Sequence, residues 1–82
     1  MAIFTYNDFR KVIRQLGFEM VRSRKHETWE KRLPDGRSLR VSISHKHSRD
    51  IPRPLFRRML KQAGVESERV FISILKGRKK NW

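Results

Sequence analysis

Cysteine is absent from the sequence, so the chain can form neither a disulfide framework nor a thiolate metal site. No apolar run approaches the length of a membrane span, and the first ten residues lack the basic and apolar regions of a signal peptide. The glycines are too scattered to form a phosphate-binding loop: Gly17, Gly36, Gly64 and Gly77. These absences predict a cytoplasmic protein that does not cross a membrane.

Acidic residues are scarce. The 82 residues include 8 Asp and Glu against 21 Lys and Arg, which gives a formal charge of +13. This excess costs stability through self-repulsion and predicts an anionic partner. RNA, DNA, a membrane surface and an acidic protein all fit, and the strength of the charge favours nucleic acid. A chain this short has little room for a buried pocket, so we expect surface chemistry without a bound cofactor.

The first helix is predicted from a stripe of apolar residues at helical spacing: Phe9, Val12, Ile13 and Leu16. Thr5 and Asp8 have the spacing of a capping box, and Gly17 suits the left-handed position after the helix. The opposite, solvent-facing side is expected to carry the basic residues Arg10, Lys11 and Arg14.

A second helix is predicted to begin with Asp50 as its cap and Pro52 in its first turn, and to end at Gly64. Its apolar stripe is Leu55, Phe56, Met59, Leu60 and Ala63. The segment 67–75 favours a short helix, although its β-branched residues leave a strand open. We assign residues 1–75 to one domain and residues 76–82 to a basic, flexible tail.

Three segments between these helices have strand character. Segments 18–23 and 26–32 can pair as a hairpin, and the Pro-Asp-Gly turn at 33–37 leads to a third strand. In this third strand, Leu39, Val41 and Ile43 alternate with polar residues, so one face of the sheet is buried. The sequence therefore predicts an α+β fold: a three-stranded antiparallel sheet with helices on one face.

The candidates for chemistry are three histidines, because their unperturbed pKa lies near neutrality: His26, His45 and His47. Antiparallel pairing would bring His26, at the start of the second strand, close to the loop containing the other two. The cations beside His26 are Arg22, Arg24 and Lys25. Cations that hold a phosphate, with an imidazole that moves a proton, are sufficient to cut RNA, which supplies its own nucleophile.

Each of these residues also has an ordinary interpretation. His26 can be a solvated strand residue or a phosphate contact. His45 and His47 can lie in a loop without a role, or could bind a metal together with Asp50, although no fourth ligand has the required spacing. Trp29 and Tyr6 could stack on bases, but the polar neighbours of Trp29 favour a core position for it.

Three stretches carry a family resemblance: "IRQLGFEMVRSRKHETW", "LPDGRSLRVSIS" and "DIPRPLFRRMLKQAG". In this order, over roughly residues 7–75, the sequence resembles the HicA family of toxin ribonucleases from bacterial type II toxin-antitoxin systems. The most specific pieces are Leu-Gly-Phe after the first helix, the histidine at the second strand, Asp-Gly-Arg in the turn and "LKQAG" at the end of the second main helix.

The resemblance implies an α-β-β-β-α fold similar to a double-stranded-RNA-binding domain, here with a short extra C-terminal helix. It also implies an mRNA interferase, a metal-independent endoribonuclease that arrests translation and is neutralised by a HicB-type antitoxin. The family's catalytic histidine matches His26. The phosphate-binding role of Arg22, Arg24 and Lys25 is expected from their charge beside this histidine and not from the resemblance. His45 and His47 remain candidates for a second proton-transfer group.

This chain departs from the family pattern at one point near the histidine. Arg24 and Lys25 stand where the family commonly has Gly-Ser, which replaces a flexible backbone point with two cations. Two other functions fit the same sequence: a non-catalytic RNA- or DNA-binding module, and an interaction protein that binds an acidic partner. Cleavage of RNA would distinguish the first hypothesis from both of these.

Overall fold

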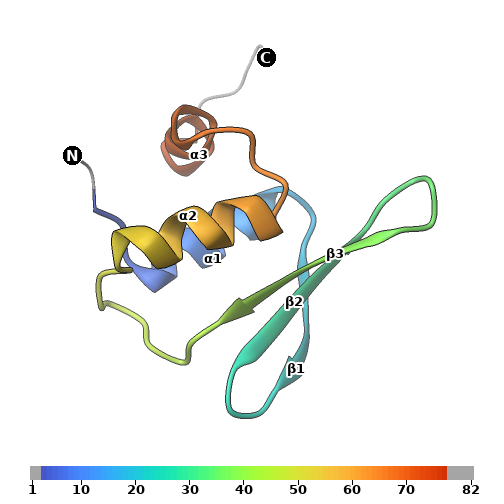
Figure 1. The fold of residues 1–82 in the computed structure, drawn as a ribbon, viewed down its shortest axis with the longest axis horizontal. Helices are drawn as coiled ribbons and strands as arrows, with labels where there is room; N and C mark the ends of the chain where they lie inside the picture. Colours follow the sequence, from blue (N-terminus) through green and yellow to red (C-terminus); the bar gives the residue numbers. More distant parts are fainter. Residues whose placement is uncertain (1–2, 78–82) are drawn as a thin grey trace.

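The computed structural model describes residues 3–77 and has the element order α-β-β-β-α-α (Figure 1). The elements are α1 Tyr6–Gln15, β1 Glu19–Ser23, β2 Glu27–Arg32, β3 Ser38–Ile43, α2 Arg53–Gln62 and α3 Glu68–Leu75. The predicted α+β fold is therefore confirmed, including the short helix at the C-terminal end. No helix within residues 3–77 is long and apolar enough to cross a membrane.

The three strands form one antiparallel sheet in the order β1-β2-β3. Glu27 pairs with Ile43 and Arg32 with Ser38, so β2 and β3 are joined in continuous register across the turn at 33–37. Between β1 and β2 the register shifts at a bulge between Met20 and Arg22. This bulge lies in an edge strand whose five residues are all exposed, where an irregular ladder displaces no core side chain.

Helix α1 begins as the sequence predicts. The Thr5 hydroxyl accepts a hydrogen bond from the Asp8 backbone N–H at 3.1 Å, and the Asp8 carboxylate accepts one from the Thr5 N–H at 2.9 Å. This reciprocal capping box satisfies two of the backbone donors that a helix start leaves free. After the helix, Gly17 has a φ of +99°, which a residue with a side chain adopts only under strain.

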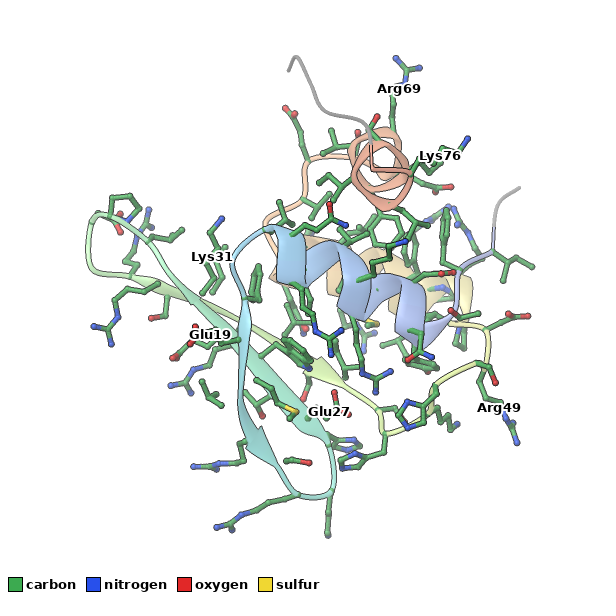
Figure 2. The ribbon with its side chains drawn as sticks, turned by 180° about the vertical axis from the view of Figure 1, so that it is seen from behind. Glu19, Glu27, Lys31, Arg49, Arg69 and Lys76 are labelled. Atoms are coloured by element: carbon green, nitrogen blue, oxygen red, sulfur yellow. The ribbon has the colours of Figure 1, made fainter. Side chains whose placement is uncertain are left out.

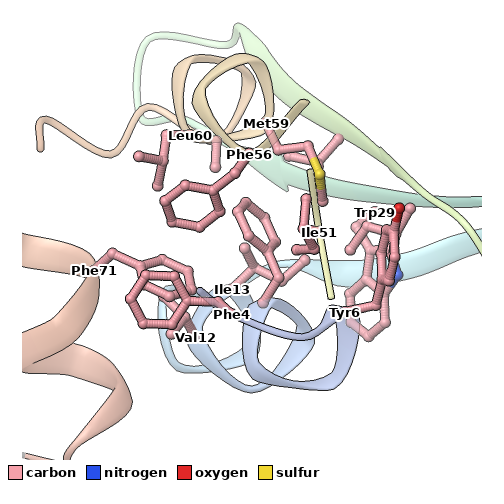
Figure 3. Close-up of a cluster of buried hydrophobic side chains, with 14 of the residues drawn as sticks. Phe4, Tyr6, Val12, Ile13, Trp29, Ile51, Phe56, Met59, Leu60 and Phe71 are labelled. Atoms are coloured by element: carbon pink, nitrogen blue, oxygen red, sulfur yellow. The ribbon is translucent and has the colours of Figure 1, made fainter. Parts of the chain in front are cut away.

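Helices α1 and α2 cover one face of the sheet, and α3 packs against α1 (Figure 1). Phe71 of α3 enters a group of aromatic rings together with Phe4, Phe9 and Phe56, with centroid distances of 4.9 to 5.4 Å for Phe71 (Figure 3). Trp29 and Tyr6 are also buried, each 4% exposed. The core position that the sequence favours for Trp29 is therefore confirmed, and neither ring is available to stack on a base.

The start of α2 differs from the prediction. Its cap is Pro52, which provides no side-chain hydrogen bond, and Asp50 instead pairs with Thr5 in an isolated bridge. The buried side chain of Ile51 explains the change, because the Ile51 N–H donates to the Phe4 carbonyl at 2.8 Å and ties this segment to the chain before α1. Asp50 is therefore part of a backbone pairing and not a helix cap.

The predicted basic tail, residues 76–82, lies mostly outside the described residues. Lys76 is the C-terminal cap of α3, and Gly77 follows it with a φ of +72°. These two residues therefore end the last helix.

Candidate functional site

His26 lies in the three-residue turn that joins β1 to β2. The turn consists of Arg24, Lys25 and His26, all exposed, and the Arg24 N–H donates to the His26 carbonyl at 3.1 Å. The prediction that His26 begins the second strand is wrong by one residue, because the ladder ends with the pair Ser23–Glu27. The histidine is therefore presented to solvent at the tip of a hairpin.

The three predicted phosphate-binding cations divide into two groups. Arg24 and Lys25 precede His26 directly in the turn. Arg22 lies on β1 opposite Thr28 of β2. The side chain of Thr28 points away from the face of the sheet on which its neighbour Trp29 is buried. It lines a shallow depression of about 290 Å³ with Val21, Thr28, Glu30 and Arg40. Arg22 thus faces the side of the sheet that the helices leave open.

His45 approaches the turn, as antiparallel pairing predicts. Its Nε2 atom lies 2.5 Å from the Arg24 carbonyl oxygen, and its Nδ1 atom lies 3.6 Å from Glu27 Oε2. The expected proximity of the two loops is therefore confirmed for His45. Both of its ring nitrogens already face oxygen atoms of the protein.

His47 has a different environment. Its side chain is exposed, and its backbone carbonyl accepts a hydrogen bond from the Asn7 N–H at 3.0 Å. Within residues 3–77, no three His, Cys, Asp or Glu side chains gather closely enough to hold a metal ion. The structure therefore offers no support for a metal site formed by His45, His47 and Asp50.

A buried ion pair supports this end of the molecule. The Arg10 Nε and Nη2 atoms donate to the two oxygens of the Glu27 carboxylate at 2.9 and 3.1 Å. Arg10 is 5% exposed and Glu27 is 8% exposed. The prediction that Arg10 lies on the solvent face of the first helix is wrong, because β2 and the loop after β3 pack over it and supply the oxygens that its guanidinium needs.

The remaining donors of Arg10 bind the loop after β3 and the start of α1. Its Nη2 donates to the Ser44 carbonyl at 2.6 Å, and its Nη1 donates to the Lys46 carbonyl at 2.8 Å and to Asn7 Oδ1 at 3.1 Å. A guanidinium has five N–H groups in one plane, and the guanidinium of Arg10 donates five hydrogen bonds. One side chain thus joins α1, β2 and the loop that carries His45.

Glu27 stays ionised in this setting. Burial raises the pKa of its carboxyl, but hydrogen bonds from Arg10 and Trp29 and the positive charge of Arg10 outweigh burial, with a smaller contribution from His45, and hold that pKa below its usual value. Trp29 Nε1 donates to Glu27 Oε1 at 2.9 Å, so the buried indole also has its polar atom paired. The carboxylate is therefore a fixed negative charge one residue after His26.

The sequence did not lead us to predict that Glu27 and Arg10 form a buried ion pair. The position of each residue in the hydrophobic pattern nevertheless indicates burial. Glu27 alternates with Trp29 along β2, so a buried Trp29 implies that Glu27 points to the same side. Arg10 follows Phe9 and lies four residues after the buried Tyr6, at the edge of the apolar stripe of α1. A charged residue of each sign at such positions indicates a buried pair.

Figure 2 shows how the charged groups are distributed. Glu27 lies near the closed end of the β1–β2 hairpin, whereas Arg69 and Lys76 project from α3 at the other end of the molecule. The hairpin turn, with its histidine and two cations, is thus well separated from the basic residues of α3.

Comparison with known proteins identifies the family of the chain. A family model described as the HicA toxin of bacterial toxin-antitoxin systems matches residues 6–65, which span α1, the whole sheet and α2 and make up more than half of the chain. No curated protein and no solved structure matches the chain. The chain therefore belongs to the HicA toxin family and is the toxin partner of a bacterial toxin-antitoxin pair.

Proposed function

We propose that this toxin is an endoribonuclease, an mRNA interferase that uses His26 as a general acid or base. The observation that carries the proposal is the exposed His26 at the hairpin tip, directly after the exposed cations Arg24 and Lys25. An imidazole that transfers a proton must contact its substrate. RNA is too large to enter the interior of a domain of this size, so the imidazole must lie at the surface. A solvent-facing turn meets that requirement.

The chemistry needs no metal, because RNA supplies its own nucleophile. In the proposed step, the 2′-oxygen loses its proton and attacks the adjacent phosphorus, the bond to the 5′-oxygen breaks, and that oxygen takes up a proton. The products are a 2′,3′-cyclic phosphate and a free 5′-hydroxyl. Arg22, Arg24 and Lys25 bind the phosphate and stabilise the charge that develops on its oxygens.

A second group is required for the other proton. Of the two candidates in the loop after β3, His45 has both ring nitrogens facing oxygens of Arg24 and Glu27. His47 has an exposed side chain. We therefore assign the second proton transfer to His47, with His26 as the first group.

Neutralisation follows from the position of the histidine. A HicB-type antitoxin would block the enzyme most simply by covering the β1–β2 turn and presenting Asp and Glu to Arg24 and Lys25. RNA binding should then be lost in the toxin-antitoxin complex. If the complex bound RNA as tightly as the free toxin does, the antitoxin would have to act elsewhere.

The function is tested with purified protein, a defined mRNA and a chelator, by mapping the RNA ends over time. The unsubstituted protein is expected to cleave and His26→Ala is not, with both folded by circular dichroism. The matched control is Arg69→Ala, an exposed residue on α3 that should cleave normally. Comparable cleavage by His26→Ala would make the assignment wrong, and salt-dependent binding without cleavage by any form would favour the non-catalytic RNA- or DNA-binding module.

A further inference from the structure

The imidazole of His45 joins two loops that are far apart in the sequence. Its Nε2 atom is 2.5 Å from the Arg24 carbonyl oxygen, in the turn between β1 and β2, and His45 itself follows β3. The Arg24 N–H in turn donates to the His26 carbonyl at 3.1 Å. The ring of His45 therefore holds the residue whose backbone closes the turn around His26.

The loop that carries His45 is itself held by α1. Arg10 donates to the carbonyls of Ser44 and Lys46, the residues on either side of His45, at 2.6 and 2.8 Å. The Asn7 N–H donates to the carbonyl of His47 at 3.0 Å. The backbone on both sides of His45 is therefore hydrogen-bonded to α1.

The second ring nitrogen of His45 faces a carboxylate at a distance longer than a hydrogen bond. Nδ1 lies 3.6 Å from Glu27 Oε2, and that carboxylate is held by two hydrogen bonds from Arg10 and one from Trp29. The carboxylate attracts the ring when the imidazole is protonated, and the hydrogen bond from Nε2 to the Arg24 carbonyl is the contact that joins the two loops.

We propose that His45 is a positioning residue that orders the Arg24–His26 turn, so that His26 meets the RNA in one geometry. The inference rests on the function proposed above, in which His26 is the acid–base group. An exposed three-residue turn is intrinsically mobile, and ordering a catalytic group before substrate binds lowers the barrier of the chemical step. His45 thus acts through the backbone of Arg24 and does not touch the substrate.

The experiment compares His45→Ala with His45→Gln, because a glutamine amide reaches about as far as Nε2 and can donate to the Arg24 carbonyl, but cannot transfer a proton. The first readout, which needs no activity, is the NMR order parameter of the Lys25 and His26 amides. We expect it to fall from about 0.85 to below about 0.6 in His45→Ala and to recover in His45→Gln. His47→Ala is the matched control for this measurement, since it removes an exposed imidazole from the same loop.

The second readout is single-turnover cleavage at saturating protein. At saturating protein the rate constant does not depend on how tightly Arg24 and Lys25 of the same turn bind RNA. We expect His45→Ala to lower this rate constant about tenfold or more, and His45→Gln to restore most of it. If both variants lost activity equally while the turn stayed ordered, His45 would be a proton-transfer group and the positioning role would be wrong.

The proposal would also be overturned by an ordered turn in His45→Ala with a normal rate. A protein that does not cleave RNA at all would contradict the proposed function, whereas the order parameters would still decide whether His45 orders the turn.

Discussion

Arg10 and Glu27 are seventeen residues apart in the sequence, and their side chains form a two-pronged ion pair that is almost fully buried, with N–O distances of 2.9 and 3.1 Å. The pair connects the middle of α1 to the first residue of β2, which directly follows His26. Both charged side chains are therefore buried directly beside the candidate site. The stability of this region therefore depends on both partners being present.

Replacing Arg10 is expected to destabilise the fold strongly. Arg10→Ala leaves the Glu27 carboxylate buried without its main partner and should lower the free energy of unfolding by about 3–5 kcal/mol. Urea denaturation followed by circular dichroism measures the loss. Lys11→Ala is the control, because Lys11 is exposed on the same helix and its removal should cost less than about 0.5 kcal/mol. A loss below about 1 kcal/mol for Arg10→Ala would mean that the pair contributes little.

Acid should destabilise the fold through Glu27. Because the pKa of this carboxyl is lower in the folded state, its contribution to stability is complete above the ordinary carboxyl pKa of 4.5 and declines as the pH falls from there through the folded-state pKa. The free energy of unfolding, measured between pH 7 and pH 3, should therefore fall less steeply in Glu27→Gln than in the unsubstituted protein. The exposed Glu66, changed in Glu66→Gln, should leave the slope unaltered. Equal slopes for all three proteins would contradict the role of Glu27.

The salt dependence of RNA affinity tests whether the β1–β2 turn is part of the RNA-binding surface. Changing both Arg24 and Lys25 to Gln removes two cations beside His26 and should reduce the slope of log Kd against log salt by about 1 to 1.5 for single-stranded RNA. The substrate is fully 2′-O-methylated RNA, which lacks the attacking hydroxyl and stays intact. The matched control, Arg69→Gln with Lys76→Gln, removes the same charge from the other end of the molecule (Figure 2). An equal loss of slope in both double variants would indicate general attraction to a basic protein.

Substituting His26 should not affect folding. His26 is exposed in the turn, so His26→Ala should change the free energy of unfolding by no more than about 0.5 kcal/mol. Denaturation in urea tests this separately from activity. The control is Trp29→Ala, which empties a core position and removes a hydrogen bond to Glu27, and should cost about 3–5 kcal/mol. Unfolding of His26→Ala would make its loss of activity uninformative about catalysis.

Local patterns in the sequence were sufficient for the element order and for most of the core. The stripe from Phe9 to Leu16 and the alternation of Leu39, Val41 and Ile43 report burial through helical and strand periods, which depend on neighbouring residues alone. The capping box at Thr5 and Asp8 is likewise local. Asp50 was misassigned because its partner, Thr5, comes from a distant segment that only the folded chain brings alongside it.

The sequence by itself determined that His26 lies beside Arg24 and Lys25 at the end of a hairpin, because strand alternation and turn residues are local signals, although it placed His26 one residue too far into the strand. The role of that histidine remains a prediction. Only the tertiary structure decided that Arg10 and Glu27 are buried and that His45 contacts Arg24 and Glu27. A charged group is buried only where several distant oxygens or donors meet it. Those partners come from α1, β2 and the loop after β3, which are neighbours in space and not in sequence.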